Sequence, residues 1–507
     1  MNYLLGIDLG TTSLKVSLYS ETGLRCGSRS WEYPIQVPQP GFAEQDPLDW
    51  WNAFINCSQQ LKIDFPDAYE KIAGIGICGQ MHSQVYLDQH DQILRPAISW
   101  MDQRTAAIAD RYNQDPSIKG LIFEHTSNTA STTYSAMHIR WVKENQPEIW
   151  EKTESILIAK DYLKFRLTGQ KATDYSEASG TLLFDNQREK WSQEMFDLFE
   201  IPAKLIPEVS ASDVIIGTVS AEAAKITGLR AGIPVANGST DNSASAFGAG
   251  MLSSSQVTLI IGTAGVITVC SDKPLIDHLD RTLCWHYCLP KHWVTLGIMQ
   301  TAGESLQWFK NSFDPPDAAG SESGDIFNRY NESIQNVPDG SEGLVFLPYL
   351  NGERTPYWDS NARGVFFGIN LKTEKSHFIK AIMEGVSFGL RNNIETVESL
   401  GIKIQDVRAV GGGLKSQVWL DILGKIIRKP ITTISGHDTA NLGNIILCGK
   451  AIGLYTSYAD TIRQLVKTDQ TVSYPDGSEI YEKQYPLFLE LYQDLKPTFK
   501  KLQVDRS

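Results

Sequence analysis

The sequence predicts an α/β protein built of two lobes. Three observations support this prediction: the chain has 507 residues, strand-like runs alternate with helical patterns, and two tight hairpins of similar design open its first and second halves. We place the boundary between two domains shortly before the second hairpin, which gives segments 1–236 and 237–507.

The first hairpin is predicted over residues 3–20. An apolar run ends at Leu9, a Gly-Thr-Thr turn follows, and residues 14–18 alternate with the period of a strand. The second hairpin is predicted over residues 257–269, with its turn at Gly262-Thr263-Ala264-Gly265. The similarity allows an internal repeat, but apolar-Gly-Thr-apolar patterns are common in sheets, so two unrelated tight hairpins are favoured.

Helical patterns are clearest in the second half. From Phe378 to Val397 apolar side chains recur every three or four residues and stop before Gly401, as in a buried helix with a glycine C-cap. A strand over 407–410, a glycine turn and a helix over 416–428 follow. We expect the last forty or so residues to form a helix that packs on one of the two lobes.

Composition restricts the classes of function. The 46 Lys and Arg residues against 59 Asp and Glu residues give a net charge of −13, which argues against a nucleic-acid-binding or anionic-membrane-binding surface. Seven cysteines without a Cys-x-x-Cys pair favour a reducing cytoplasm over a disulfide framework or a four-cysteine zinc site. No secretory signal and no stretch long enough to span a bilayer is predicted.

Asp8 lies inside an apolar strand, directly before the Gly-Thr-Thr turn with Thr11 and Thr12. A buried carboxylate needs a partner, and hydrated Mg²⁺ is one, since it accepts one or two carboxylates together with phosphate oxygens. The backbone N–H groups of such a turn can cradle phosphate. The alternative is that Asp8 caps the turn, and the spacing does not separate the two.

Two further segments allow both a structural and a chemical interpretation. The glycines 411–413 between a strand and a helix let a phosphate or a flat ligand approach the backbone, but they also serve ordinary strand-to-helix packing. Asp241, with Asn242 after it, follows Gly238-Ser239-Thr240 and precedes a run of small residues. Its carboxylate could cap a helix or act as a general base.

His82 lies in a polar loop with Gln80 and Met81, and Trp100, Asp102 and Arg104 follow after a strand-like segment. Polyols are bound by planar and charged hydrogen-bonding groups and an aromatic wall. The alternative for His82 is an imidazole that is satisfied by neighbouring backbone groups.

Together these segments resemble the FGGY family of carbohydrate kinases from Asn2 to about Tyr455. The run GVFFGINLKTEKSHFIKAIME, from Gly364 to Glu384, is similar to the second signature of that family. Further similar segments are GIDLGTTSLKV, GICGQMHSQVYLD, LIAKDYLKFRLTG, DYSEASGTLLFD, FLPYLNGERTPYWD and AVGGGLKSQVWLDIL. The resemblance implies two actin/hexokinase-like (ribonuclease H-like) domains flanking a central catalytic cleft, with sugar on 1–236 and nucleotide on 237–507.

The resemblance also implies roles for individual residues. Asp241 would be the base that faces the accepting hydroxyl, and Asp8 would hold Mg²⁺ through water. The other residues implied are Met81, His82 and Asn242 at the sugar, Thr11, Thr12, Gly262 and Thr263 at the phosphates, and Gly412, Gly413, Ser416 and Trp308 on the nucleotide side.

The implied reaction is ATP- and Mg²⁺-dependent phosphorylation of a sugar hydroxyl by a cytoplasmic enzyme, with a homodimer as the family expectation. Among the branches of the family, the segments are most similar to the one that phosphorylates D-xylulose; gluconate or another polyol is the alternative substrate. A nucleotide-gated sugar-binding protein without turnover is the alternative of a different class. The chain departs from the family pattern at His138, Ala264, Asn441 and Asn444.

Overall fold

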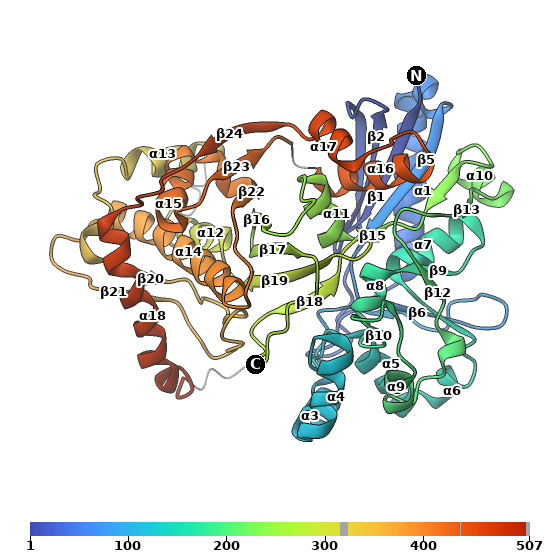
Figure 1. The fold of residues 1–507 in the computed structure, drawn as a ribbon, viewed down its shortest axis with the longest axis horizontal. Coiled ribbons are helices and arrows are strands. Elements are labelled where there is room, and N and C mark those ends of the chain that lie inside the picture. The colour runs from blue at the N-terminus through green and yellow to red at the C-terminus, as the bar shows by residue number, and fades with distance from the viewer. Residues whose placement is uncertain (315–322, 437, 503–507) are drawn as a thin grey trace.

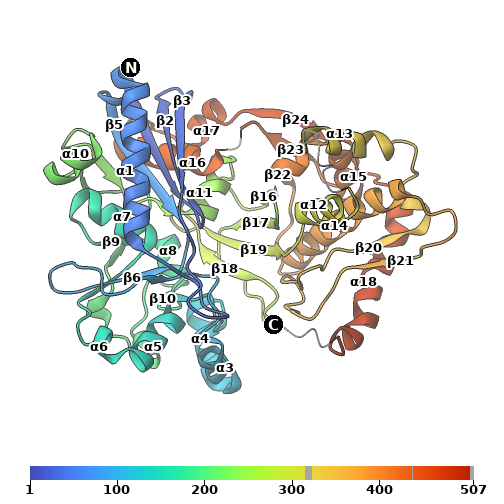
Figure 2. The same cartoon turned by 180° about the vertical axis from the view of Figure 1, so that it is seen from behind.

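The computed structural model describes residues 1–314, 323–436 and 438–502. The chain folds into two lobes, each built on a seven-stranded sheet with helices packed against it (Figure 1). Figure 2 shows the same two lobes from behind.

The sheet of the first lobe contains the first predicted hairpin. Its strand order is β13 (Ile215–Thr218), β14 (Pro234–Ala236), β5 (Ile72–Gly79), β1 (Tyr3–Leu9), β2 (Ser13–Ser20) and β3 (Arg25–Glu32), and β15 (Ser239–Thr240) also pairs with β5. Strands β1 and β2 are antiparallel with Leu9 opposite Leu14, which confirms the hairpin. Strand β5 runs parallel to β1.

The sheet of the second lobe repeats this arrangement. Its order is β18 (Leu283–His286), β19 (Trp293–Met299), β17 (Gly265–Ser271), β16 (Gln256–Ile261), β22 (Asp406–Val410), β23 (Ile431–Ile434) and β24 (Thr468–Val472). Strand β16 pairs antiparallel with β17 and parallel with β22, as β1 does with β2 and β5. This shared topology favours an internal repeat over two unrelated hairpins.

The other strands form smaller sheets. A four-stranded sheet has the order β4 (Glu44–Gln45), β7 (Ala97–Ile98), β6 (Gln84–Leu87) and β8 (Ser155–Ile158). Two-stranded pairs join β9 (Ala172–Asp174) to β12 (Glu208–Ser210), β10 (Phe184–Asp185) to β11 (Lys190–Trp191), and β20 (Val345–Leu347) to β21 (Val365–Phe367).

The α-helices follow the strands in both lobes. Those up to the second hairpin are α1 (Pro47–Asp64), α2 (Pro66–Tyr69), α3 (Ala106–Gln114), α4 (Pro116–Thr126), α5 (Ser135–Asn145), α6 (Pro147–Trp150), α7 (Ala159–Thr168), α8 (Tyr175–Ser179), α9 (Gln193–Leu198), α10 (Ala221–Thr227) and α11 (Asp241–Gly248). The later ones are α12 (Gly303–Phe313), α13 (Ser323–Ser333), α14 (Lys375–Glu398), α15 (Gln417–Ile427), α16 (Thr439–Ala451), α17 (Tyr458–Leu465) and α18 (Glu479–Phe499).

The predicted helices of the second half are confirmed. Helix α14 is almost wholly buried, and Gly401 has a φ of +95° just beyond its end. Helix α15 begins after Ser416, whose side chain accepts a hydrogen bond from the Trp419 N–H. Helix α18 packs into the core of the second lobe. The sequence alone did not decide between the two lobes.

Helix α16 lies on the first lobe although it follows β23 of the second. In Figures 1 and 2 it is drawn beside β1 and β5. Its Ile445 and Cys448 form a buried cluster with Leu4, Tyr19 and Ala236. The chain therefore crosses from the second lobe back to the first before α18 closes the second lobe.

Helices α11 and α16 approach each other through glycine. A Cβ on Gly443 would lie 2.1 Å from the Ala244 carbonyl oxygen, and one on Gly248 would lie 1.8 Å from that of Thr439. Such contacts exclude any side chain. The helix that begins with Asp241 is thus held directly against α16.

All seven cysteines are free. Six of them are buried, and Cys26, on the edge strand β3, is partly exposed. No helix in the described ranges is long and apolar enough to cross a membrane.

Candidate active site

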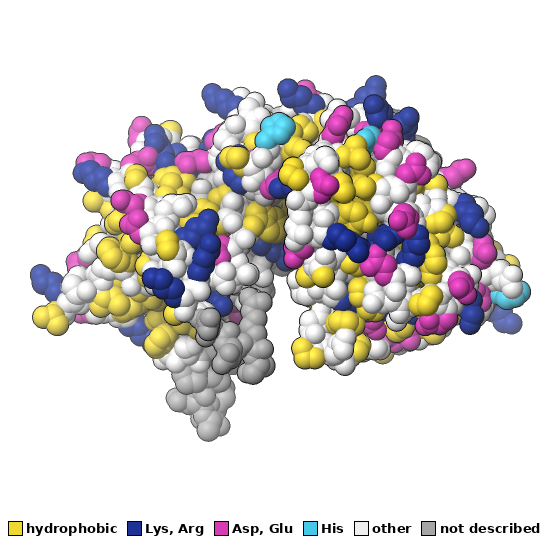
Figure 3. Space-filling view, turned by 90° about the horizontal axis from the view of Figure 1, so that it is seen from below, with side chains coloured by type: hydrophobic (Ala, Val, Ile, Leu, Met, Phe, Trp, Pro, Cys, Tyr) yellow, Lys and Arg dark blue, Asp and Glu magenta, His cyan; other side chains and the backbone are white. Residues whose placement is uncertain are grey.

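The predicted catalytic residues come together at one edge of the first sheet. Strands β1, β5 and β15 are parallel neighbours, and their register aligns Asp8 with Cys78 and Cys78 with Ser239. Asp241 follows directly after β15. Ligands of α/β sheets bind at the carboxyl ends of the strands, which is where this row lies. The surface between the two lobes is hollowed (Figure 3).

Asp8 does not cap the turn that follows it. The hydrogen bond to its carboxylate comes from the Cys78 thiol on the neighbouring strand, over 3.4 Å, while the Gly10 N–H donates to the Ser13 carbonyl. Burial raises the pKa of Asp8 to about 6, and the charge of Asp438 adds to this effect. The carboxylate is therefore left with capacity for a further partner.

Asp241 is not the helix cap either. The Thr240 side chain accepts from the Ser243 N–H and caps α11, while Asp241 accepts a 2.7 Å hydrogen bond from the Asn242 N–H. Burial raises the pKa of Asp241 to about 7, and the nearby charge of Asp8 raises it further. A carboxyl with a pKa near neutrality is suited to take up a proton.

The first hairpin turn is fixed from the side of the four-stranded sheet. Thr11 accepts hydrogen bonds from Trp100 Nε1 to its hydroxyl, over 3.1 Å, and from Gln45 Nε2 to its carbonyl, over 2.7 Å. Tyr33 donates through its hydroxyl to the Gly10 carbonyl and through its N–H to that of Thr12. These bonds use the carbonyls of the turn and hold its backbone in place.

Met81 and His82 follow strand β5, and both are almost fully buried. His82 Nδ1 lies 2.6 Å from the Gly180 carbonyl, and burial lowers the pKa of the imidazole to about 3. The ring is thus neutral, and donation from Nδ1 leaves Nε2 as an acceptor. Tyr134 and Trp285 flank the ring edge-on at 5.4 and 5.7 Å between centroids.

In the second lobe, Gly262 and Thr263 form the turn between β16 and β17. The start of α12 rests on this turn, because the Ala302 N–H donates to Thr263 over 2.9 Å and the Gly303 N–H to Gly262 over 2.8 Å. Gly411 has a φ of +127°, and a Cβ there would lie 2.3 Å from the Ile261 carbonyl oxygen. This glycine is therefore required for packing.

The other predicted nucleotide-side residues of this lobe differ in their surroundings. A Cβ on Gly412 would meet nothing within 4 Å, so the backbone is accessible there, whereas Gly413 packs against Ile261. Ser416 caps α15 and donates to Asn331 over 2.6 Å. Trp308 lies on α12 against Phe313, with ring centroids 6.0 Å apart.

Asp102 and Arg104 are engaged with the protein. Asp102 accepts from the backbone of Ala43 and from the Arg104 guanidinium, which also pairs with Glu44 at 2.8 Å. The guanidinium lies 3.8 Å from the ring centroid of Phe42. These two residues stabilise the loop that carries Trp100, and the polyol-binding role that the pattern also allowed is not favoured.

Two charged residues of this region were not predicted. Lys15 stands opposite Asp8 on β2, and its ammonium lies 3.7 Å from Asp438, at the entrance to α16. Asp438 also accepts from Ser17 at 2.5 Å and from Tyr19 at 3.0 Å. Residue alternation in the predicted hairpin could have identified Lys15 as the residue opposite Asp8. No local sequence pattern places Asp438 beside Lys15.

A buried ionic network lies behind the predicted sugar loop. Lys160 is 2.7 Å from Asp161, 2.9 Å from Asp174 and 3.9 Å from Glu177. Burial raises the pKa of Glu177 well above its usual range, and the charge of Asp241 contributes to this shift. The network therefore adjoins the candidate base.

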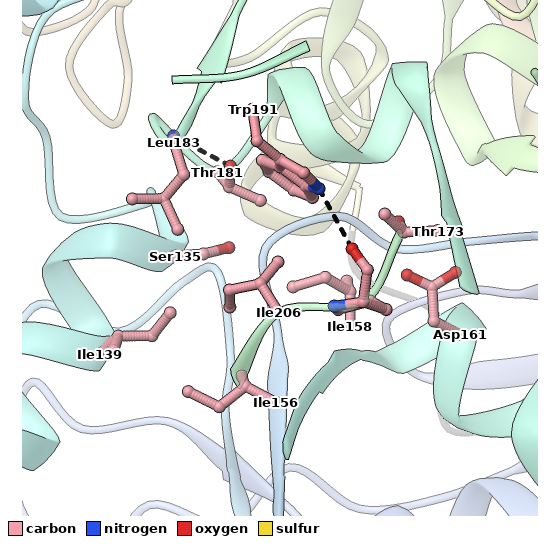
Figure 4. Close-up of a pocket in the computed structure, with 11 residues that line it drawn as sticks. Ser135, Ile139, Ile156, Ile158, Asp161, Thr173, Thr181, Leu183, Trp191 and Ile206 are labelled. Atoms are coloured by element: carbon pink, nitrogen blue, oxygen red, sulfur yellow. Dashed lines mark hydrogen bonds between the residues drawn. The ribbon is translucent and has the colours of Figure 1, made fainter. Parts of the chain in front are cut away.

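Figure 4 shows a small cavity inside the first lobe, next to this network. Its wall is mostly apolar, with Ile139, Ile156 and Leu183 among the lining residues, and Trp191 donates to the Pro207 carbonyl at its rim over 3.1 Å. None of the predicted site residues lines it. It is a packing defect of the lobe and separate from the candidate site.

Two similar sheets, each with a tight hairpin turn, and two carboxyls at the strand ends form an arrangement that suits a two-lobed phosphotransferase. Residues 3–248 match the N-terminal domain of the FGGY family of carbohydrate kinases, and residues 257–452 match its C-terminal domain. The chain belongs to this family and has its actin/hexokinase-like fold. It is a carbohydrate kinase, and membership implies ATP as the phosphoryl donor.

Individual relatives cover nearly the whole chain. A xylulose kinase of Lactococcus lactis subsp. lactis is 33% identical, with 97% of each chain covered. A gluconokinase of Bacillus subtilis is 28% identical and covers 99% of this chain and 98% of its own. The solved structure of a ligand-bound xylulose kinase from Lactobacillus acidophilus has a TM-score of 0.92 at 27% identity, covering 99% of this chain and all of the other.

Proposed function

We propose that this kinase transfers the γ-phosphoryl group of Mg-ATP to a hydroxyl of D-xylulose, with Asp241 as the general base. The observation that carries the proposal is the partly buried carboxyl of Asp241 at the strand ends, affected by the charge of Asp8 and with a pKa near 7. The names of the similar xylulose kinases support D-xylulose as the acceptor.

The sugar is proposed to bind on the first lobe. Met81 and His82 follow β5, Asn242 follows Asp241 just after β15, and these two strands are parallel neighbours. Neutral His82 would accept a hydrogen bond from a sugar hydroxyl at Nε2, because its Nδ1 is engaged with Gly180. Neutral groups suit an uncharged sugar.

The nucleotide is proposed to bind between the lobes and along the second. Thr11 and Thr12 in one turn and Gly262 and Thr263 in the other would donate to the phosphates, and Gly412, Gly413, Ser416 and Trp308 would border the nucleoside. Backbone donors at fixed positions stabilise the charge that develops in phosphoryl transfer without reorganising.

Asp8 is proposed to hold Mg²⁺ through water. The residues fit such an ion, because the site offers one carboxylate with spare capacity, and Mg²⁺ keeps several waters and takes its other ligands from substrate phosphates. No group of three or more His, Cys, Asp or Glu residues in the described part of the chain could cage a metal. The ion would neutralise phosphate charge.

The test is ADP release with Mg-ATP over D-xylulose, L-xylulose, D-ribulose, L-ribulose, gluconate, glycerol and erythritol, with mass spectrometry of the product. We expect selective turnover of D-xylulose. Asp241→Asn should lower kcat by a factor on the order of 10² to 10⁴, because it removes the base and keeps the shape. Asp110→Asn, at an exposed position on helix α3, is the matched control and should act as the wild type.

Other results would lead to other conclusions. Preference for gluconate, which the gluconokinase relative makes the second candidate, would keep the chemistry and change the substrate. An Asp241→Asn variant as fast as the wild type would contradict the base assignment. Binding of ATP and sugar without any product would point to a gated sugar-binding protein.

A further inference from the structure

Arg354 is presented between the lobes by a rigid loop. The backbones of Glu353 and Asp359 exchange two 2.9 Å hydrogen bonds and close the loop. Thr355 ties the loop to β19, since its N–H donates to Ile298 over 2.9 Å and its hydroxyl accepts from the Ile298 N–H over 3.0 Å. The position of the Arg354 Cα is therefore fixed by the second lobe.

The guanidinium of Arg354 has no anionic partner among the residues that the structure describes. Its contact is with the ring of Trp100, across the lobes, 5.9 Å from guanidinium carbon to ring centroid. The adjacent Glu353 does not pair with it, because one oxygen of that carboxyl accepts from the N–H groups of Gln300, at 2.8 Å, and Arg354, at 2.7 Å. Burial raises the pKa of Glu353 to about 8, so this carboxyl is mostly protonated at pH 7.

Two arginines with buried side chains, Arg95 and Arg104, are paired with an anion. Arg95 and Arg104 both contact Glu44, at 2.5 and 2.8 Å. Desolvation lowers the pKa of Arg354, which reflects the cost of keeping its cation away from water. A rigidly held cation without an anion is the arrangement expected of a site whose anion arrives with a ligand.

Contacts within the protein link this cation to both hairpin turns. On the first lobe, Trp100 under the guanidinium donates to the Thr11 hydroxyl over 3.1 Å. On the second lobe, Glu353 holds Gln300, from which the chain runs through Thr301 to Ala302, whose N–H donates to Thr263. Arg354 is thus linked to the first turn through Trp100 and to the second through Glu353 and residues 300–302.

From this placement, and resting on the proposed function, we propose that Arg354 is a ligand of the phosphoryl group in transfer. Guanidinium groups bind phosphate oxygens through two parallel N–H donors. In the step, the sugar oxygen forms a bond to the γ-phosphorus, the bond to the β,γ-bridging oxygen breaks, and ADP leaves with that electron pair. Asp241 takes the hydroxyl proton, while Arg354 donates hydrogen bonds to non-bridging oxygens and keeps its protons.

Arg354→Met tests the proposal. Arg354→Lys is the variant that keeps the positive charge and loses the two parallel N–H donors. The matched control is Arg363→Met in the same segment, because Arg363 bonds to backbone carbonyls of Ser360 and Ala362. We expect Arg354→Met to lower kcat by a factor on the order of 10² to 10³, with an intermediate loss in Arg354→Lys. The KM for D-xylulose and the melting temperature should stay close to those of the wild type.

A binding measurement keeps this inference separate from the choice of sugar. By calorimetry, the β,γ-imido analogue of ATP with Mg²⁺ should bind Arg354→Met about tenfold or more weakly than the wild type, while ADP binds both alike, since a charge-assisted hydrogen bond is worth about 1.5–3 kcal/mol. This holds even if no sugar in the panel is phosphorylated, in which case the proposed function fails and the phosphate site stands.

Two results would overturn the proposal. One is an Arg354→Met variant that retains wild-type kcat and wild-type affinity for the ATP analogue. The other is a variant that raises the KM for gluconate alone and leaves the D-xylulose reaction unchanged, which would make Arg354 a ligand of a substrate carboxylate instead.

Discussion

Asp8 and Asp241 are partly buried carboxyls at the ends of two strands that flank β5, and the charge of Asp8 raises the pKa of Asp241. Their pKa values, about 6 and about 7, lie above the ordinary range of aspartate mainly because burial disfavours the charged form. Cys78 between them contributes a weak donor to Asp8 and no charge. The pair therefore titrates close to physiological pH.

This titration predicts a pH dependence of activity. Protonated Asp241 cannot accept the hydroxyl proton, so kcat/KM measured at low concentrations of sugar and nucleotide should fall as the pH drops below about 7. Protonation of Asp8 near pH 6 should steepen the fall. The pH profile of the residual activity of Asp241→Asn should show no change near pH 7.

A rate profile of the wild type that stays flat from pH 8 down to pH 5 would contradict this prediction. Stability of the free protein under the same conditions is the necessary control, since acid unfolding would also lower the rate. A melting curve at each pH separates the two effects.

At the scale of elements, the contact between α11 and α16 positions the candidate base. Gly443 allows the two helix backbones to approach, because any Cβ there would lie 2.1 Å from the Ala244 carbonyl oxygen. Asp241 is the first residue of α11, so a shift of that helix moves the carboxylate. Displacements of about 1 Å at a reacting group cost rate as well as stability.

Gly443→Ala should therefore lower both the melting temperature and kcat, the latter on the order of tenfold to 10²-fold. Gly120→Ala in α4 is the matched control, because a Cβ there meets nothing within 4 Å. That substitution should leave kcat unchanged and raise stability by about 0.5–1 kcal/mol, since alanine is the better helix former. Equal behaviour of the two variants would contradict the role of the contact.

The sequence could predict those features of the fold that depend on residues close together in the chain. The hairpins and helix α14 follow from periods of two and of 3.6 residues, and the end of β1 follows from the turn after it. Whether Asp8 and Asp241 cap or catalyse depends on where the Cys78 and Thr240 side chains point, which local sequence does not encode. Arg354 becomes a candidate only when Trp100, more than two hundred and fifty positions earlier, is seen beneath it.

At the scale of the whole molecule, the first lobe is not a continuous segment. Leu4, Tyr19 and Ala236 are covered by Ile445 and Cys448 of α16, which lies more than two hundred residues beyond the predicted boundary. Burial of such a cluster is worth several kcal/mol, on the order of 1.5–3 kcal/mol for each large side chain.

A fragment of residues 1–236 should therefore be poorly soluble alone, because its sheet lacks the helix that covers these side chains. Co-expression with 237–507 should restore a soluble complex. Size-exclusion chromatography and circular dichroism check both outcomes, and a monodisperse, fully folded 1–236 fragment would refute the prediction.

The distribution of the thiols has a practical consequence. Because six cysteines are buried and Cys26 alone is partly exposed, on an edge strand away from the row of Asp8 and Asp241, a maleimide dye should attach at one position without any native cysteine being replaced. Cys26 is thus a native site at which the first lobe can be labelled with a single fluorescent dye.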